Sequence, residues 1–147
     1  MMGPIRYKAK DFLRRYRAAK LRMESARREI EKQRESLTGI TAQIKQDKIT
    51  GGGGADRMAD AVAHIIDAEA ALCDEAEAVE TALREVLAAI NSVPDEMQRA
   101  VLMLRYIEGL DWLEIAGRIG YEISNTYIIH GKALAAVDDW LKLCRKL

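Results

Sequence analysis

The chain has 147 residues with 23 basic and 23 acidic side chains, and 49% of its residues are hydrophobic but only 5% aromatic. With two prolines in all, this composition is typical of a mostly helical protein and not of a large globular enzyme. No apolar run has transmembrane length, and the basic stretch from Met1 to Lys20 lacks the apolar core of a signal peptide. We therefore expect a soluble cytoplasmic protein that does not enter a membrane.

Residues with catalytic or metal-binding chemistry are few. The chain has two histidines and two cysteines, and Cys73 and Cys144 lie far apart with no zinc-like spacing, so we expect reduced cysteines in packing roles and no metal site. The run Gly51-Gly52-Gly53-Gly54 lacks the Lys-Ser/Thr of a phosphate-binding loop, and no nucleophile-elbow motif occurs. The sequence therefore predicts neither an enzyme nor a cofactor.

The glycine run separates two long helical patterns. The apolar seam before it comprises Phe12, Tyr16, Ala19, Met23, Ala26, Ile30, Gln33, Leu37, Ile40 and Ile44. The seam assigned after it comprises Met58, Val62, Ile65, Glu69, Leu72, Ala76, Val79, Leu83, Val86 and Ile90. Both alternate spacings of three and four residues, as coiled-coil helices do. Two seams of equal length around a short turn predict an antiparallel, coiled-coil-like helical hairpin over residues 1–91.

Charge supports this pairing of helices. Residues 1–48 hold 14 basic and 6 acidic side chains, a net +8, whereas residues 49–147 hold 9 and 17, a net −8. A turn centred between Gly52 and Gly53 would bring Arg27 and Arg28 near Glu77 and Glu80. The basic first helix has a second interpretation, in which it follows DNA. The hairpin seam is also compatible with a four-helix homodimer, and we expect a homo-oligomer.

Residues 92–147 form the second predicted domain. Ser92 is the expected cap of a helix that begins near Pro94, with Asp95 completing a capping box, and this helix ends at Gly109. Asp111 caps a short helix whose apolar residues Ile115, Ile119 and Tyr121 surround Ala116. Gly120 then occupies a turn that requires a positive φ, and a last helix runs from about Ile123 almost to the C-terminus. This arrangement predicts a helix-turn-helix, which commonly lays its second helix in a DNA groove.

The candidate DNA contacts follow from the helical spacing. If Thr126, Ile129 and Ala133 face the core, the opposite face presents polar and apolar groups to a ligand. The predicted contacts on this face, with one arginine of the preceding helix for a phosphate, are Ser124, Asn125, Tyr127, Ile128, Lys132 and Arg118. Lys132 is the only basic residue of the reading face, so we expect weak DNA binding by this domain alone.

The stretch Val93 to Leu134 resembles the promoter-binding fourth region of bacterial sigma factors. The matching pieces are PDEMQRAVLMLRY at 94–106, EGLDWLEIA at 108–116 and the turn at Gly120. Nearly the whole chain resembles small phage and prophage proteins, of which ArpU- and RinA-type late transcription regulators are better-known relatives; the matching pieces are DRMADAV at 56–62 and HGKAL at 130–134. The resemblance implies a phage-derived transcription regulator that binds double-stranded DNA, with RNA polymerase as a further candidate partner.

A second interpretation comes from another functional class. The apolar residues Ile123, Tyr127 and Ile128 could bind a partner helix or a polymerase subunit, in which case the chain is a protein-interaction module that does not contact DNA. For the remaining prominent residues we expect structural roles: an ion pair between Arg105 and Glu114, and packing for His130.

Overall fold

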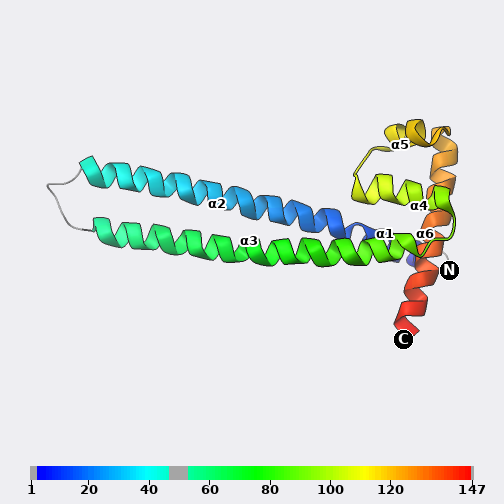
Figure 1. Cartoon of the computed structure of the whole chain (residues 1–147), viewed down its shortest axis with the longest axis horizontal. Coiled ribbons are helices and arrows are strands. Elements are labelled where there is room, and N and C mark those ends of the chain that lie inside the picture. Colours follow the sequence, from blue (N-terminus) through cyan, green and yellow to red (C-terminus); the bar gives the residue numbers. More distant parts are fainter. Residues whose placement is uncertain (1–2, 47–52, 147) are drawn as a thin grey trace. The chain divides into compact units, whose positions relative to one another are not determined.

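The computed structural model describes residues 3–46 and 53–146, and every element in these ranges is a helix (Figure 1). The elements are α1 (Gly3–Leu13), α2 (Arg15–Gln46), α3 (Gly54–Asn91), α4 (Glu96–Leu102), the π-helix η1 (Met103–Ile107), α5 (Trp112–Ile119) and α6 (Ile123–Lys146). The predicted all-α class is therefore confirmed. None of the helices in the described ranges is long and apolar enough to cross a membrane.

Two compact units divide the chain. One comprises Ala19–Val79, and the other comprises the residues up to Ala18 together with those from Glu80 onward. This division differs from the boundary that we expected between residues 91 and 92. The reason is that α1 and the last turns of α3 contribute Leu13, Val86 and Ile90 to the core around α4 and α6, and so belong with the C-terminal helices.

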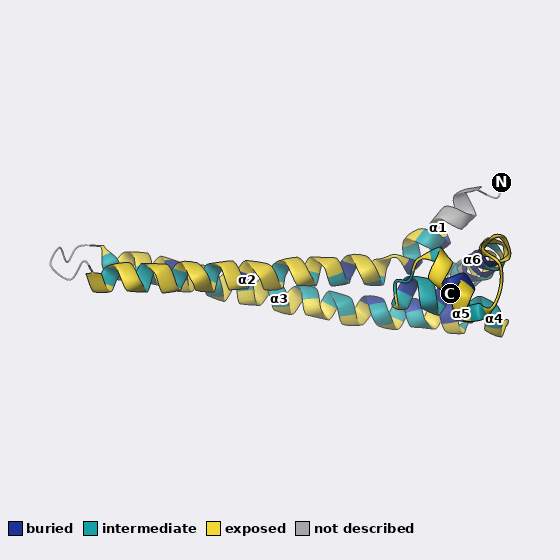
Figure 2. Ribbon diagram, turned by 90° about the horizontal axis from the view of Figure 1, so that it is seen from above, coloured by how far each residue is buried: buried dark blue, intermediate teal, exposed yellow. Residues whose placement is uncertain are grey.

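The Ala19–Val79 unit is an antiparallel pair of helices, formed by most of α2 and the first two thirds of α3 (Figure 1). The assigned seam of α2 is confirmed here: its members in this unit are buried or half-buried, whereas the residues between them are mostly exposed (Figure 2). The turn expected at Gly51 and Gly52 lies outside the described residues. Gly53 does adopt a positive φ of 96°, which suits a glycine at the entry to α3.

The seam assigned to α3 is partly wrong. Val62, Glu69 and Ala76 are exposed, and smaller or charged residues take their places. The buried or half-buried residues of α3 in this unit are Gly54, Met58, Ala61, Ile65, Ala68, Leu72, Glu75, Ala78 and Val79. Alanine occurs at both buried and exposed positions, so it contributes little to a pattern based on side-chain size. In an alanine-rich helix the seam is therefore easily assigned to the larger neighbouring residues.

The register of the hairpin also differs from the expected one. Polar side-chain contacts between its helices join Arg22 with Glu75 (3.2 Å), Arg34 with Glu69 (3.3 Å), and Thr41 Oγ1 with Met58 Sδ (3.8 Å). Arg28 instead hydrogen-bonds Ser25 on its own helix. The physical reason is that α3 already begins at Gly54 while α2 ends at Gln46, so the link is centred near residue 50 and not within the glycine run.

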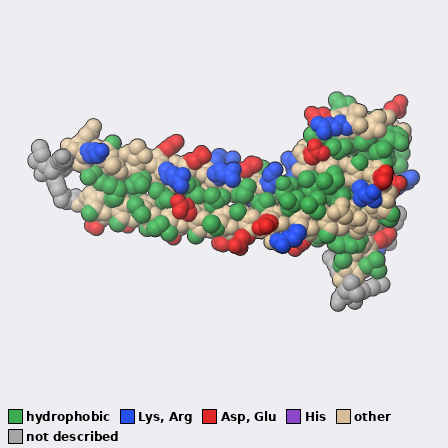
Figure 3. All heavy atoms as spheres, viewed as in Figure 1, with side chains coloured by type: hydrophobic (Ala, Val, Ile, Leu, Met, Phe, Trp, Pro, Cys, Tyr) green, Lys and Arg blue, Asp and Glu red, His purple; other side chains and the backbone are tan. Residues whose placement is uncertain are grey.

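Figure 3 displays the charge pattern of this helix pair, with hydrophobic side chains between the helices and charged ones along their outer edges. The ion pairs are exposed, and each contributes at most about 1 kcal/mol. They therefore favour one register over others more than they stabilise the fold.

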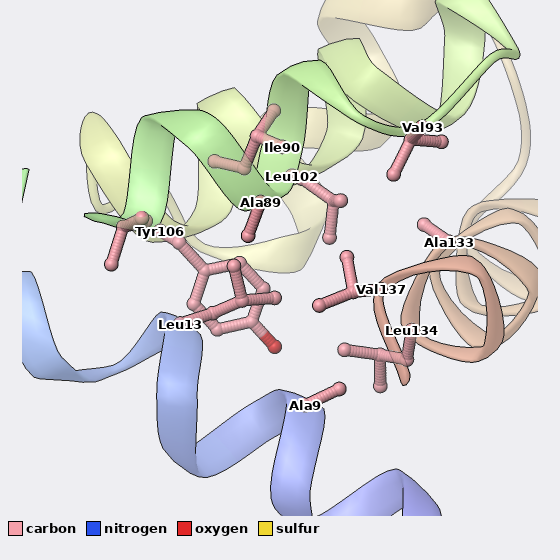
Figure 4. Packing of buried hydrophobic residues seen from close by; sticks show 11 residues of the cluster. Ala9, Leu13, Ala89, Ile90, Val93, Leu102, Tyr106, Ala133, Leu134 and Val137 are labelled. Carbon is pink, nitrogen blue, oxygen red and sulfur yellow. The ribbon is translucent and has the colours of Figure 1, made fainter. Parts of the chain in front are cut away.

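The other unit has a contiguous apolar core to which α1, α3, α4, η1 and α6 all contribute. Leu13 from α1, Ile90 from α3, Leu102 from α4, Tyr106 from η1 and Val137 from α6 point toward one another (Figure 4). All five are fully or almost fully buried. The second half of α6 thus packs on α1, which explains why the apolar stripe of α6 extends beyond the helix-turn-helix.

The N-cap of the helix after Pro94 lies three residues later than we expected. Asp95, not Ser92, is the N-cap: its carboxylate accepts a hydrogen bond from the Gln98 amide at 2.9 Å, whereas the Ser92 hydroxyl donates to the Ala89 carbonyl at the end of α3. The last turns of this helix are π-helical, with the Glu108 amide donating to the Met103 carbonyl. The wider turn displaces Tyr106 and Arg105 relative to an α-helix.

Candidate nucleic-acid interface

The local sequence explains why α5 and α6 form a helix-turn-helix. Asp111 is the N-cap of α5 and accepts a hydrogen bond from the Glu114 amide at 2.8 Å. Gly120 ends α5 with φ 79° and donates its amide to the Ala116 carbonyl, a left-handed helix end that glycine adopts without steric cost. The turn and both caps are where the sequence predicted them.

The inner face of the motif is small and tightly packed. Ile115 and Ala116 of α5, with Thr126 and Ala133 of α6, are buried, and the Thr126 hydroxyl donates to the Glu122 carbonyl at 3.0 Å. Tyr121 was wrongly assigned to this core, because it is 46% exposed. It follows the left-handed residue Gly120, and the chain reverses direction there, so the helical spacing that linked it to Ile115 no longer applies.

The outer face of α6 carries the predicted DNA contacts. Ser124, Asn125, Tyr127, Ile128 and Lys132 are all exposed and lie on the N-terminal half of this helix. Tyr127, Ile128 and Lys132 line a shallow groove of about 440 Å³ together with Gly131 and Ala135. A Cβ atom at position 131 would meet open space. The five residues therefore share one accessible surface, which we call the α6 face.

Arg118, the predicted phosphate contact, is exposed on α5 but has a protein partner. Its Nη1 atom lies 3.6 Å from the Glu108 Oε1 atom. Both side chains are about half exposed, so the pair is weak and a phosphate could displace the carboxylate.

Trp112 supports the α6 face from behind. Its ring lies 5.1 Å from the Tyr127 ring and 4.5 Å from the His130 ring, and the Arg105 guanidinium lies 4.7 Å from its centroid. Arg105 also donates to the Leu110 carbonyl at 3.0 Å. The predicted ion pair between Arg105 and Glu114 is therefore wrong: no such pair forms among the described residues, because the π-helical turn directs Arg105 toward the indole ring.

His130 and Tyr106 form a buried polar pair between η1 and α6. The Tyr106 hydroxyl and His130 Nε2 share a hydrogen bond of 2.7 Å, and the two rings stack. Burial, with the cations Lys10, Arg105 and Arg14 nearby, lowers the pKa of His130 to about 4. Burial likewise raises the pKa of Tyr106 to about 12. The packing role predicted for His130 agrees with this position. Nothing in the sequence pattern indicated Tyr106 as its hydrogen-bond partner.

Cysteine and the other metal-ligating side chains are dispersed over the described part of the chain. No group of three or more His, Cys, Asp or Glu side chains there could hold a metal ion. Cys73 and Cys144 are free and exposed, so the packing role predicted for them is wrong.

The turn before α5 requires a glycine at position 109. Gly109 has φ 76°, and a Cβ atom at this position would overlap the Arg17 guanidinium. We expect Gly109→Ala to lower the free energy of unfolding by about 1–3 kcal/mol, through backbone strain and displacement of Arg17. Gly117→Ala is the matched control, since that helical position faces open space and alanine should stabilise α5 by up to about 1 kcal/mol. Denaturant unfolding measures both, and equal effects would contradict the account.

The chain matches no protein-family model, no curated protein and no solved structure. The likeness to sigma fourth regions and to phage late regulators therefore stays a prediction made from the motifs of the sequence.

Proposed function

We propose that the chain is a sequence-specific DNA-binding regulator of transcription, of the phage-derived, cytoplasmic class that its sequence resembles. The observation that carries the proposal is the exposed α6 face on the second helix of a helix-turn-helix with a glycine turn. In such motifs the second helix enters the major groove and its exposed side chains meet the base edges.

The residues of the α6 face have different expected roles in DNA recognition. Asn125 can hydrogen-bond a base edge in two places, as asparagine does with adenine, while Ser124 can donate to or accept from a base or a phosphate. Tyr127 and Ile128 offer apolar contact to a thymine methyl group. Lys132 is the one cation of the α6 face and pairs with a phosphate, so that electrostatic attraction there is modest.

A dimer would add affinity by placing two reading helices on one duplex. The hairpin supports this part of the proposal through exposed apolar side chains on α3, where Val62 is 40% and Ile66 60% exposed. A second copy of the chain would cover them, and RNA polymerase is the further partner that the sigma-like motif implies. The solution mass of the full chain tests the dimer.

A protein-interaction module is the second candidate function. It is favoured by a specific observation: Leu113 is 73% exposed and Ile128 57% exposed, and Tyr121, Ile123 and Tyr127 are also exposed. Such a group of large apolar side chains on a small domain is typical of a protein contact surface. In this case a polymerase subunit would occupy the α6 face in place of DNA.

Selection from a random-sequence duplex pool by the full chain, with and without RNA polymerase, tests the proposal. We expect enrichment of a defined site. Asn125→Ala should relax the preference at one position and cost about 1–3 kcal/mol in binding to the selected site. Lys132→Ala should weaken binding to all duplexes and reduce the salt slope by about 1.

Lys142→Ala is the matched control, because Lys142 is also exposed on α6 but lies near its C-terminal end. It should bind the selected duplex as the unaltered chain does. Failure to enrich any sequence in either condition would exclude the proposal and favour the protein-interaction module.

A further inference from the structure

Arg17 and Arg105 lie at the turn between η1 and α5, and Lys10 and Arg14 lie near the neighbouring Tyr106–His130 pair. Lys10, Arg14 and Arg17 follow one another at spacings of four and three residues, so they share one face along the end of α1 and the start of α2. The amide of Arg14 donates to the Lys10 carbonyl, and that of Ala18 to the Arg14 carbonyl, so helical hydrogen bonding continues through the junction. We call Lys10, Arg14, Arg17 and Arg105 the turn cluster.

Contacts made by two members fix the position of this cluster. The Arg17 guanidinium lies directly against Gly109, the residue whose lack of a side chain makes room for it. Arg105 donates to the Leu110 carbonyl of the same turn and covers the Trp112 ring. Trp112 in turn contacts Tyr127 of the α6 face. One member of the turn cluster, Arg105, is therefore separated from the α6 face by a single indole ring.

The cations of the cluster are available to a ligand. Arg14 and Arg17 are exposed, Lys10 and Arg105 are half-buried, and none of the four forms an ion pair with a described residue. The acidic residues at the turn are engaged elsewhere: Glu108 pairs with Arg118, and the Asp111 carboxylate caps α5. Four like charges without a carboxylate partner repel one another, and a bound anion would relieve this repulsion.

The pKa values of two buried side chains, Tyr106 and His130, are shifted by the same cations. Tyr106 of η1 and His130 of α6 form a buried pair, and all the charged groups that shift their pKa values are the cations Lys10, Arg14 and Arg105. A carboxylate close to either ring would act in the opposite sense. Cations therefore dominate the electrostatic environment of these two rings.

We propose that the turn cluster is a binding site for the phosphates of a DNA backbone, through which the N-terminal helices supply the cations that the α6 face lacks. This inference rests on the proposed function, since it takes duplex DNA to be the ligand of the neighbouring helix. Phosphodiesters suit the cluster chemically, because guanidinium groups bind phosphate oxygens in pairs and the phosphates of a duplex recur at a spacing that several separate cations can follow.

Salt dependence of binding to a mixed-sequence duplex tests the site in the full chain. Each lost phosphate contact lowers the slope of log K against log salt concentration by about 0.9. We expect the double variant Arg14→Gln/Arg17→Gln to lose about 2 from this slope and to bind tens of times more weakly near 0.1 M salt. The control is Arg27→Gln/Arg28→Gln, which removes the same charge from exposed arginines of α2 in the other unit and should keep the slope.

Arg17 packs on Gly109, so its loss could perturb the fold. Arg14→Gln alone, at an exposed position, should lower the slope by about 1 without a change in thermal unfolding. Variants that keep the slope of the unaltered chain overturn the inference, even if duplex selection enriches a defined site. A lowered slope without any enriched site supports the turn cluster and excludes the sequence-specific function. Absence of all duplex binding overturns both.

Discussion

Replacing Leu102 by alanine is expected to cost about 2–5 kcal/mol of unfolding free energy. Leu102 has 0% exposure and lies where α3, α4 and α6 meet, beside Ile90, Tyr106 and Val137. Its loss removes transfer free energy and leaves a cavity among elements that are held from several sides and cannot close over it. Denaturant unfolding followed by circular dichroism measures the change.

Leu113→Ala is the matched control for this experiment. It is the same substitution in the same unit, at a position 73% exposed on α5, and we expect a change within about 0.5 kcal/mol. Similar losses for the two variants would contradict the assignment of the core at the junction of α3, α4 and α6.

Acid is expected to destabilise, through His130, the unit that comprises the residues up to Ala18 and those from Glu80 onward. The pKa of its side chain is about 4 in the folded chain, against 6.5 for an ordinary histidine, so the unfolded chain binds the proton first as the pH falls. The contribution of the neutral ring is therefore fully present above pH 6.5 and is lost between pH 6.5 and about 4. Its total amounts to about 3 kcal/mol.

The measurement is the unfolding free energy at a series of pH values for the unaltered chain and for His130→Gln, whose amide can still hydrogen-bond Tyr106. The variant should lose the decrease between pH 6.5 and 4, while His64→Gln, at an exposed position of α3, should keep it. Parallel curves for His130→Gln and the unaltered chain would contradict a buried neutral histidine.

Asp138 acts in the opposite sense. Asp138 is 2% exposed, its Oδ2 atom has no hydrogen-bond partner among the described residues, and burial raises its pKa. A carboxyl pKa that is raised in the folded chain favours folding at low pH, and this contribution is lost as the pH rises. Comparison with His130→Gln is needed for this reason, because the total pH dependence of the unaltered chain combines both groups.

Features specified by local chemistry were predictable from the sequence. Gly120 and Asp111 determine a left-handed turn and a helix cap through their own backbone and side chain, and both were placed correctly. The seam of α2 was found because its members contrast strongly with the charged residues between them. The exposure of Ser124, Asn125 and Lys132 follows from helical periodicity once Thr126 and Ala133 are assigned to the inner face.

Features that depend on tertiary contacts were not predictable. The association of α1 with α6 joins residues from the two ends of the chain, and neither the pattern of Leu13 nor that of Val137 specifies the partner. The π-helical turn at Met103–Ile107 redirects Arg105 from Glu114 to Trp112 and brings Tyr106 to His130. A sequence pattern based on α-helical spacing does not predict a π-helical turn. The seam of α3 was displaced because Ala61 and Ala68 contrast too little with their neighbours.

Photo-cross-linking from position 128 tests most directly whether the α6 face contacts DNA. A benzophenone side chain at Ile128, 57% exposed, is compared with one at Leu143, 62% exposed and about 22 Å farther along the same helix. With the full chain, duplex DNA and RNA polymerase present together, we expect adducts with DNA from position 128 and none from position 143. Adducts from position 128 with a polymerase subunit alone would contradict DNA recognition by α6.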